Sequence, residues 1–183
     1  MAVIGFGRIG SLAAAHAAAL GFRVVVHDPN VAAASVRAAG HAPADLDGAL
    51  AAADIVTLHV PLTDRTRHLL NGETIARMRP GALVVNTCRG GLVDEAALAA
   101  RWRRAMSARR RSTCSRPSRC PPGSPLRGAP GVLLTPHAAW YSPDSLADLP
   151  RLAARQIADF LQGRPVPSIV NPGYAAVCAG GEA

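Results

Sequence analysis

The sequence contains no lysine, so all twenty of its basic residues are arginine. Acidic residues are missing from one stretch, RWRRAMSARRRSTCSRPSRC (residues 101–120), which holds eight of those arginines. The rest of the chain carries twelve arginines and twelve acidic residues, so the net charge of +8 comes from this stretch alone. A positive field over the whole surface, of the kind that attracts nucleic acid, is therefore excluded, and the stretch needs its own explanation.

Long apolar runs and a cysteine framework are also absent. No stretch approaches the roughly twenty apolar residues of a membrane-spanning helix, and the apolar start of the chain is interrupted by glycines and by Arg8, unlike a signal peptide. Four cysteines in 183 residues favour reduced thiols and a cytoplasmic setting. Cys114 and Cys120 lack two further ligands for zinc, so no metal site is predicted.

Apolar, β-branched segments alternate with alanine-rich helical segments along the chain. Near-continuous apolar strands that alternate with helices are typical of a parallel sheet covered on both faces. The sequence therefore predicts an α/β fold with a Rossmann-type doubly wound parallel sheet. The predicted strands are residues 2–7, 22–28, 54–60, 82–87 and 131–136, and the predicted helices are residues 8–20, 31–39, 45–53, 71–81, 93–100 and 142–163.

A glycine-rich segment, VIGFGRIG, joins the first predicted strand to the first predicted helix. Its Gly5, Gly7 and Gly10 have the GxGxxG spacing that allows a tight turn, close approach of a pyrophosphate and close helix–strand packing. Asp28 ends the next predicted strand, where a carboxylate can accept hydrogen bonds from ribose hydroxyls and repel a 2′-phosphate. The pattern predicts binding of NAD rather than NADP, and a glycine turn with a helix-capping Asp is the alternative.

Three polar groups stand at the ends of other predicted strands, at the edge where such a domain performs its chemistry. These are His59, Arg89 and His137. An arginine can hold a carboxylate in a bidentate manner, and a histidine can transfer a proton near neutral pH. Beside a nicotinamide, this combination fits reduction of a 2-keto acid; a helix cap or a salt bridge for the arginine, and a hydrogen-bonded strand-end histidine, are the structural alternatives.

Together these motifs resemble the nucleotide-binding domain of the D-isomer-specific 2-hydroxyacid dehydrogenases. The matching segments are GFGRIG, HVPLT, TRHLLN, RPGALVVNTCRGGLVDEAAL and LLTPHAAWYS, and the likeness covers residues 1–100 and 121 to about 172. The segment HAAWYS is similar to the branch that contains the C-terminal-binding protein corepressors and their bacterial enzyme relatives.

The resemblance implies that NAD is the cofactor, that Arg89 binds the carboxylate and carbonyl of a small 2-keto or 2-hydroxy acid, and that His137 is the acid/base. It also implies a homodimer formed through the nucleotide-binding domain. The cofactor contacts that it implies are Gly5, Gly7, Arg8, Ile9, Gly10, Asp28, Val60, Pro61, Thr66, Thr87, Cys88, Arg89, His137, Ala139 and Trp140. Cys88 stands where the family usually has a small residue.

Two departures from the family pattern affect the expected function. The family carries a long segment before the glycine loop that forms most of a substrate domain, and this chain starts at that loop, so we expect that domain to be largely absent. The family also has a glutamate that pairs with the histidine, and by spacing it falls at Ser118. Residues 1–172 are expected to form the dinucleotide-binding domain, and residues 173–183 a tail.

The basic stretch has the composition that a frameshift in a GC-rich gene produces. Back-translated with GC-rich codons and read one base earlier, it becomes ALAAGHVGAAALDVLEAEPL, which restores a strand and puts a glutamate at the position of Ser118. Trp102 and Met106 have single codons, and both fit. Because Arg, Ser and Pro cannot enter a sheet interior without unpaired charge, we expect an irregular basic loop in place of one central strand.

The predicted function is therefore that of an NAD-dependent D-2-hydroxyacid dehydrogenase, present as an inactive or impaired fragment. An NAD-binding regulatory protein that dimerises, as in the corepressor branch, is the alternative. An arginine-rich arm that binds nucleic acid is the minor alternative.

Overall fold

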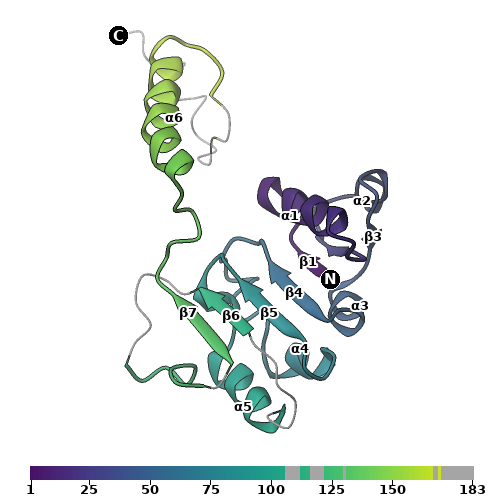
Figure 1. Ribbon diagram of the computed structural model, residues 1–183. Coiled ribbons are helices and arrows are strands. Elements are labelled where there is room, and N and C mark those ends of the chain that lie inside the picture. The colour runs from purple at the N-terminus through teal and green to yellow at the C-terminus, as the bar shows by residue number, and fades with distance from the viewer. Residues whose placement is uncertain (106–111, 116–121, 130, 167–168, 170–183) are drawn as a thin grey trace. The chain divides into compact units, whose positions relative to one another are not determined.

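The structure is a computed structural model that describes residues 1–105, 112–115, 122–129, 131–166 and 169 (Figure 1). The chain divides into two compact units, Met1–Ala139 and Trp140–Ala183. The strands of the first unit are β1 (Ala2–Ile4), β2 (Val25–His27), β3 (Ala42–Pro43), β4 (Ile55–Leu58), β5 (Leu83–Asn86), β6 (Ser112–Ser115) and β7 (Val132–Thr135). Its helices are α1 (Arg8–Ala19), α2 (Ala33–Ala38), α3 (Leu46–Ala52), α4 (Gly72–Arg77), the 3-10 helix η1 (Gly90–Leu92) and α5 (Glu95–Ala105).

The strands form one sheet in the order β3-β2-β1-β4-β5-β6-β7, and every neighbouring pair is parallel. Strand β1 lies between β2 and β4, so the chain adds strands first on one side of β1 and then on the other (Figure 1). This is the doubly wound arrangement, and it confirms the predicted Rossmann-type α/β fold.

One part of the fold prediction is wrong. Instead of an irregular basic loop, Ser112–Ser115 form strand β6, which pairs with β5 and β7. The reason is local composition, because the four residues that pair are Ser, Thr, Cys and Ser, and the arginines lie on either side of them. Small and β-branched residues can join a sheet without taking a charge into it. Ser118, the expected position of the family glutamate, lies outside the described residues.

Alternation along β1 shows how the sheet is covered. Ala2 and Ile4 belong to one buried cluster, which also contains Leu50 of α3 and Leu98 of α5. Val3 belongs to another cluster, which includes two alanines of α1. Because successive strand residues point to opposite faces, α1 covers one face, and α3 and α5 cover the other. The core is therefore centred on β1, the strand from which the glycine loop emerges.

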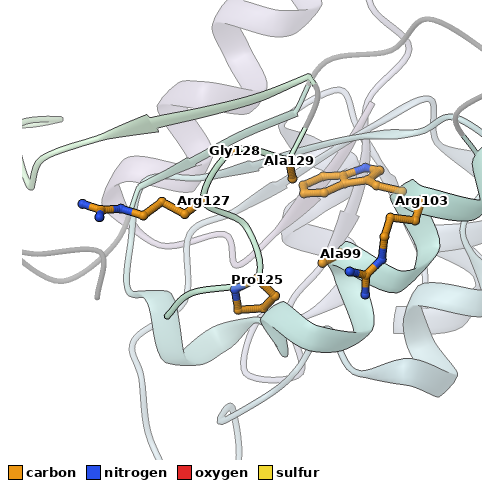
Figure 2. Close-up of a pocket in the computed structure, with 7 residues that line it drawn as sticks. Ala99, Arg103, Pro125, Arg127, Gly128 and Ala129 are labelled. Carbon is orange, nitrogen blue, oxygen red and sulfur yellow. The ribbon is translucent and has the colours of Figure 1, made fainter. Parts of the chain in front are cut away.

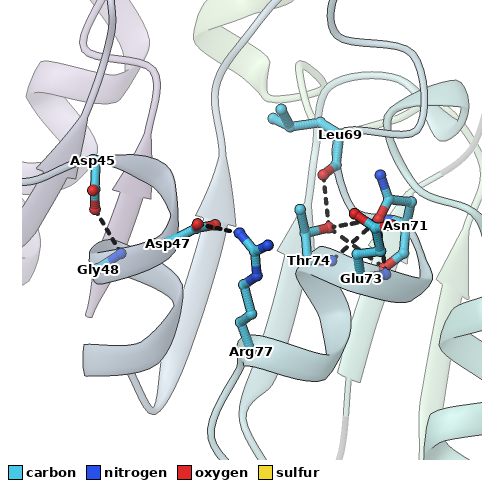
Figure 3. Close-up of polar contacts among 8 residues, drawn as sticks. All are labelled: Asp45, Asp47, Gly48, Leu69, Asn71, Glu73, Thr74 and Arg77. Carbon is cyan, nitrogen blue, oxygen red and sulfur yellow. Dashed lines mark hydrogen bonds and ion pairs between the residues drawn. The ribbon is translucent and has the colours of Figure 1, made fainter.

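Polar side chains fix the helices that precede β4 and β5 (Figure 3). Asp45 caps α3 by accepting a hydrogen bond from a backbone N–H of its first turn. Asn71 and Thr74 form a reciprocal capping box at the start of α4. Arg77 of α4 also forms an ion pair with Asp47 of α3. These caps define where each helix begins, so they help set where the following strand enters the sheet.

The second unit consists of α6 (Pro143–Leu161) and the residues around it. Ser142 caps the helix by accepting a hydrogen bond from the Ser145 N–H at 3.1 Å, and Pro143 occupies its first turn. The helix is strongly amphipathic, yet none of its residues is buried. Within the described part of the chain, neither this helix nor any other is both long and apolar enough to cross a membrane.

Candidate functional site

The predicted site residues of the first unit lie at one edge of the sheet. The glycine loop follows β1, and Asp28 follows β2. Arg89 follows β5, and His137 follows β7. Since all neighbouring strands are parallel, these residues share the carboxyl edge. Strands β5 and β7 are separated by β6 alone, which puts their axes about 10 Å apart.

The three glycines of the loop meet different surroundings. Gly5 has φ +95°, and a Cβ on it would lie 2.5 Å from the His59 carbonyl oxygen. A Cβ on Gly10 would lie 2.0 Å from the Gly5 carbonyl oxygen. A Cβ on Gly7 would have nothing within 4 Å. Gly5 and Gly10 are thus required by the loop's own packing, whereas the space beside Gly7 is open to a ligand.

The residues at the start of α1 fit a dinucleotide. Gly7 is the N-cap, and no side chain caps the helix at this position. The backbone N–H groups of the first turn and the positive end of the helix dipole therefore lie beside the open space, as a pyrophosphate requires. Arg8 and Ile9 of the first turn are exposed, and Ile9 retains 70% of its accessible surface. An apolar side chain this exposed is available to pack against a bound ligand.

Asp28 ties the end of β2 to the glycine loop. One carboxylate oxygen accepts a hydrogen bond from the Phe6 N–H at 2.7 Å, and the other accepts one from the Asn30 N–H at 2.9 Å. Each carboxylate oxygen has a second acceptor site, so the same side chain can also receive ribose hydroxyls. This anchoring of the loop was not predicted from the sequence.

The segment after β4 is shaped by Thr66. Its hydroxyl donates to the Pro61 carbonyl oxygen at 2.6 Å and accepts from the Thr63 N–H at 2.7 Å. Val60, at the start of this segment, is half-buried, and its side chain lies where a Cβ on Gly5 would come within 2.8 Å. Thr66 therefore holds the backbone of residues 61–66 in a turn, in addition to the cofactor contact predicted for it.

A buried amide builds the turn that carries Arg89. Asn86, at the end of β5, is 1% exposed. Its side-chain N–H donates to the Arg89 carbonyl oxygen at 2.8 Å, and its side-chain oxygen accepts from the Cys88 N–H at 3.0 Å. Thr87 and Arg89 are exposed on this turn. Sequence reasoning missed Asn86, although a polar residue at the end of the apolar run LVVN was a usable signal.

Arg89 is held by the backbone and not by an acid. Its Nη1 donates to the Cys88 carbonyl oxygen at 2.9 Å, and no carboxylate among the described residues forms an ion pair with it. The Cys88 thiol donates to the Leu58 carbonyl oxygen at 3.1 Å. Burial raises the pKa of this thiol, and the positive charge of Arg89 opposes that effect. Cys88 is therefore a packed, protonated thiol beside an exposed guanidinium.

The remaining predicted residues lie at the boundary between the two units. His137 is exposed, and Ala139 is the last residue of the first unit. Trp140 begins the second unit, where its ring meets that of Tyr141 edge-on at 5.6 Å. The structure thus brings the glycine loop, Asp28, Arg89 and His137 to one edge, and Trp140 belongs to the other unit.

A separate pocket of 240 Å³ is lined by the end of α5 and by the turn that precedes β7 (Figure 2). Both segments lead into the starts of strands, so this pocket lies at the amino edge of the sheet, opposite the predicted site. Arg103 and Arg127 extend to different sides of this pocket. Their guanidinium groups do not converge on a common point, so they do not form a clamp for an anion. Among the described residues, no group of His, Cys, Asp and Glu side chains could hold a metal ion.

Comparison with known proteins identifies relatives of this architecture. Residues 1–139 match the sequence model of the family described as "D-isomer specific 2-hydroxyacid dehydrogenase, NAD binding domain". A D-3-phosphoglycerate dehydrogenase of Synechocystis sp. is 36% identical over 172 residues, which are 93% of this chain and 31% of that protein.

Solved structures agree with this match. The crystal structure of D-lactate dehydrogenase with NAD+ from Lactobacillus jensenii is 26% identical, with a TM-score of 0.79 over 93% of this chain and 55% of that chain. A D-isomer specific 2-hydroxyacid dehydrogenase from Xanthobacter autotrophicus, in complex with NADPH and MES, is 32% identical, with a TM-score of 0.76 over 94% of this chain and 54% of that chain. The chain spans about half the length of these structures. It belongs to the D-isomer specific 2-hydroxyacid dehydrogenase family, and residues 1–139 correspond to the family's NAD binding domain.

Proposed function

We propose that the first unit binds NAD(H) at the glycine loop and uses the carboxyl edge of its sheet for hydride transfer between a 2-keto acid and a 2-hydroxy acid. The observation that carries this proposal is the loop itself. Gly5 and Gly10 are fixed by contacts that exclude a methyl group, and the space beside Gly7 is open at the uncapped start of α1. Bound NADH supplies the hydride, and bound NAD+ accepts it in the reverse direction.

The chain's own polar groups would bind the substrate and move the proton. Arg89 is exposed at the same edge of the sheet as the cofactor loop and has no carboxylate partner among the described residues, so its guanidinium is available for a substrate carboxylate. His137 is exposed at the same edge, where an imidazole can donate a proton to the forming alkoxide or accept it in reverse. Ser118 stands where the resemblance expects a glutamate and carries no negative charge, so we propose that the chain is catalytically impaired.

Asp28 should make the chain prefer NAD(H) to NADP(H). Its carboxylate is fixed beside the glycine loop by the Phe6 and Asn30 N–H groups, so a 2′-phosphate bound there would meet a negative charge that repels it. The test is titration of both reduced cofactors, followed by quenching of tryptophan fluorescence. Equal affinity, or tighter binding of NADPH, would remove Asp28 from this role.

A matched variant tests the frameshift hypothesis. In this variant, residues 101–120 are replaced by ALAAGHVGAAALDVLEAEPL, the sequence of the restored frame. This change puts LDVL at the positions of β6, where apolar side chains suit a strand paired on both sides. We expect both chains to bind NADH, with a higher melting temperature for the restored one. A restored chain that melts lower than the original would contradict the frameshift hypothesis.

The homodimer and the corepressor-like regulatory role remain predictions from the resemblance. Turnover of a 2-keto acid would distinguish an enzyme from a regulatory protein. A salt-sensitive shift of DNA by the pure chain, lost when the arginines of 101–120 are replaced, would favour the nucleic-acid alternative.

A further inference from the structure

His59 lies where three backbone segments meet. Its N–H donates to the Ile4 carbonyl oxygen at 2.7 Å, so it continues the ladder between β1 and β4. Its carbonyl oxygen would be 2.5 Å from a Cβ on Gly5, and its Cβ would be 3.2 Å from a Cβ on Gly10. The glycine loop, the first turn of α1 and the end of β4 therefore touch around His59 without room for a methyl group.

Among the described residues, the imidazole has one hydrogen-bond partner. Its Nε2 lies 3.0 Å from the Thr57 hydroxyl oxygen, and Thr57 is 4% exposed. Its Nδ1 is buried, and no described group forms a hydrogen bond with it. If the hydroxyl donates to Nε2, only the Nδ1–H is left without a partner. The opposite tautomer would leave both the hydroxyl hydrogen and Nδ1 unpaired, so the structure favours a neutral ring with its proton on Nδ1.

A second proton has no place in this arrangement. Burial lowers the pKa of His59, and burial is the only resolved cause. The charged and titratable groups on α1 and at the ends of β2 and β5 are Arg8, His16, His27, Asp28, Cys88 and Arg89. The added proton would sit on Nε2, so the Thr57 hydroxyl hydrogen would lose its acceptor there and meets no other among the described residues. A buried charge would be added to a ring whose Nδ1–H already has no partner among them. Protonation therefore requires the ring to leave its site, which disturbs its contacts with the glycine loop.

We infer that neutral His59 is a positioning residue that holds the glycine loop in its dinucleotide-binding conformation. The inference rests on the proposed binding of NAD(H) at this loop. The protonated ring belongs to a displaced form in which the loop N–H groups no longer converge on the open space beside Gly7. Because acid favours the displaced form, the affinity for NADH should be highest above the ordinary pKa of histidine. It should fall as the pH drops below that value.

The test compares the original chain with a His59→Gln variant. Glutamine can still bond with the Thr57 hydroxyl but cannot become charged. NADH is titrated between about pH 7.5 and about pH 5.5, a range that spans the ordinary histidine pKa. We expect the affinity of the original chain to fall by about threefold to tenfold, since tenfold is the limit for one histidine over this range, and that of His59→Gln by less than about threefold. Other titrating groups are common to both chains, so an equal fall in both would overturn the inference.

A second measurement needs no ligand. Hydrogen exchange measures how strongly the amides of residues 5–10 are protected relative to the unfolded chain. On the same acidification, this protection should fall about tenfold in the original chain but not in His59→Gln. If neither chain binds NADH at any pH, the proposed function fails, and amide exchange alone decides the role of His59. Protection that is independent of pH in the original chain would refute that role.

Discussion

Gly7 and Gly10 belong to one motif, yet a methyl group at each should have opposite consequences. A Cβ on Gly10 would meet the Gly5 carbonyl oxygen at 2.0 Å, so Gly10→Ala must displace the loop or α1. We expect this variant to lose about 2–4 kcal/mol of unfolding free energy. A Cβ on Gly7 meets nothing within 4 Å, so Gly7→Ala should keep the melting temperature of the original chain.

Gly7→Ala should instead weaken NADH binding by at least about tenfold, because the methyl group would occupy the space that the pyrophosphate needs. Thermal unfolding and NADH titration of both variants provide the check. If Gly7→Ala binds NADH as well as the original chain, the cofactor does not approach the loop from the open side.

Cys88 should be a poor nucleophile despite its position beside Arg89. Burial raises the pKa of its thiol, and the thiol donates to the Leu58 carbonyl oxygen, so little thiolate exists at neutral pH. We expect alkylation of Cys88 by iodoacetamide to be at least about tenfold slower than that of free cysteine at neutral pH, and to accelerate only above the ordinary pKa of cysteine. Mass spectrometry of the peptide that contains Cys88 measures this rate separately from the other cysteines.

At the scale of an element, the end of β5 decides how Arg89 is presented. Asn86 uses both halves of its amide to close the turn after the strand. Asn86→Asp would keep the acceptor for the Cys88 N–H but replace the donor with a buried negative charge facing the Arg89 carbonyl oxygen. This variant should cost about 2–4 kcal/mol of unfolding free energy, measured by urea denaturation. Thr87→Ala, on the exposed part of the same turn, should change it by less than about 0.5 kcal/mol.

The elements also show what sequence patterns can and cannot predict. The apolar runs around β1, β2, β4, β5 and β7 predicted five strands of the sheet, because a parallel strand buried on both faces leaves a clear compositional signal. Strand β3 has only two residues, Ala42 and Pro43, at the edge of the sheet, so no such signal exists. Strand β6 was missed because the whole basic stretch was treated as charged, although the four residues of the strand contain no arginine.

Arg101 gives a second example of the same error. It is the first residue of the basic stretch, yet it lies in α5, and its guanidinium donates to the carbonyl oxygens of Met78 and Arg79 at 2.7 Å each. These bonds pair two carbonyl groups at the C-terminal end of α4. A count of residue types cannot reveal such contacts. The candidate site was also predicted only in part. Its glycines and strand-end residues were predicted from spacing. The role of Asp28 in holding the glycine loop depends on a contact between two strand ends, and that of Asn86 depends on hydrogen bonds within its own turn.

At the scale of the whole molecule, the division into two units separates residues that the resemblance groups together. His137 belongs to the first unit and Trp140 to the second, and all of α6 remains without a buried residue. The cofactor loop, by contrast, is complete within the first unit, since its contacts come from β1, β2, β4 and α1. Cofactor binding should therefore be more robust than catalysis.

Catalysis should be undetectable in the 183-residue chain. Arg89 and His137 are present at the carboxyl edge, but they are exposed, and an active site that excludes water needs a further covering surface. The chain also spans only about half of the solved relatives. The resemblance further predicts that Ser118 replaces a glutamate of the family. We expect no measurable oxidation of NADH with glyoxylate, pyruvate or hydroxypyruvate, although NADH itself binds. Ser118→Glu alone should not produce activity, because the surrounding arginine-rich stretch is unchanged. Robust turnover by the original chain, abolished by His137→Ala, would refute both the impaired state and the frameshift hypothesis.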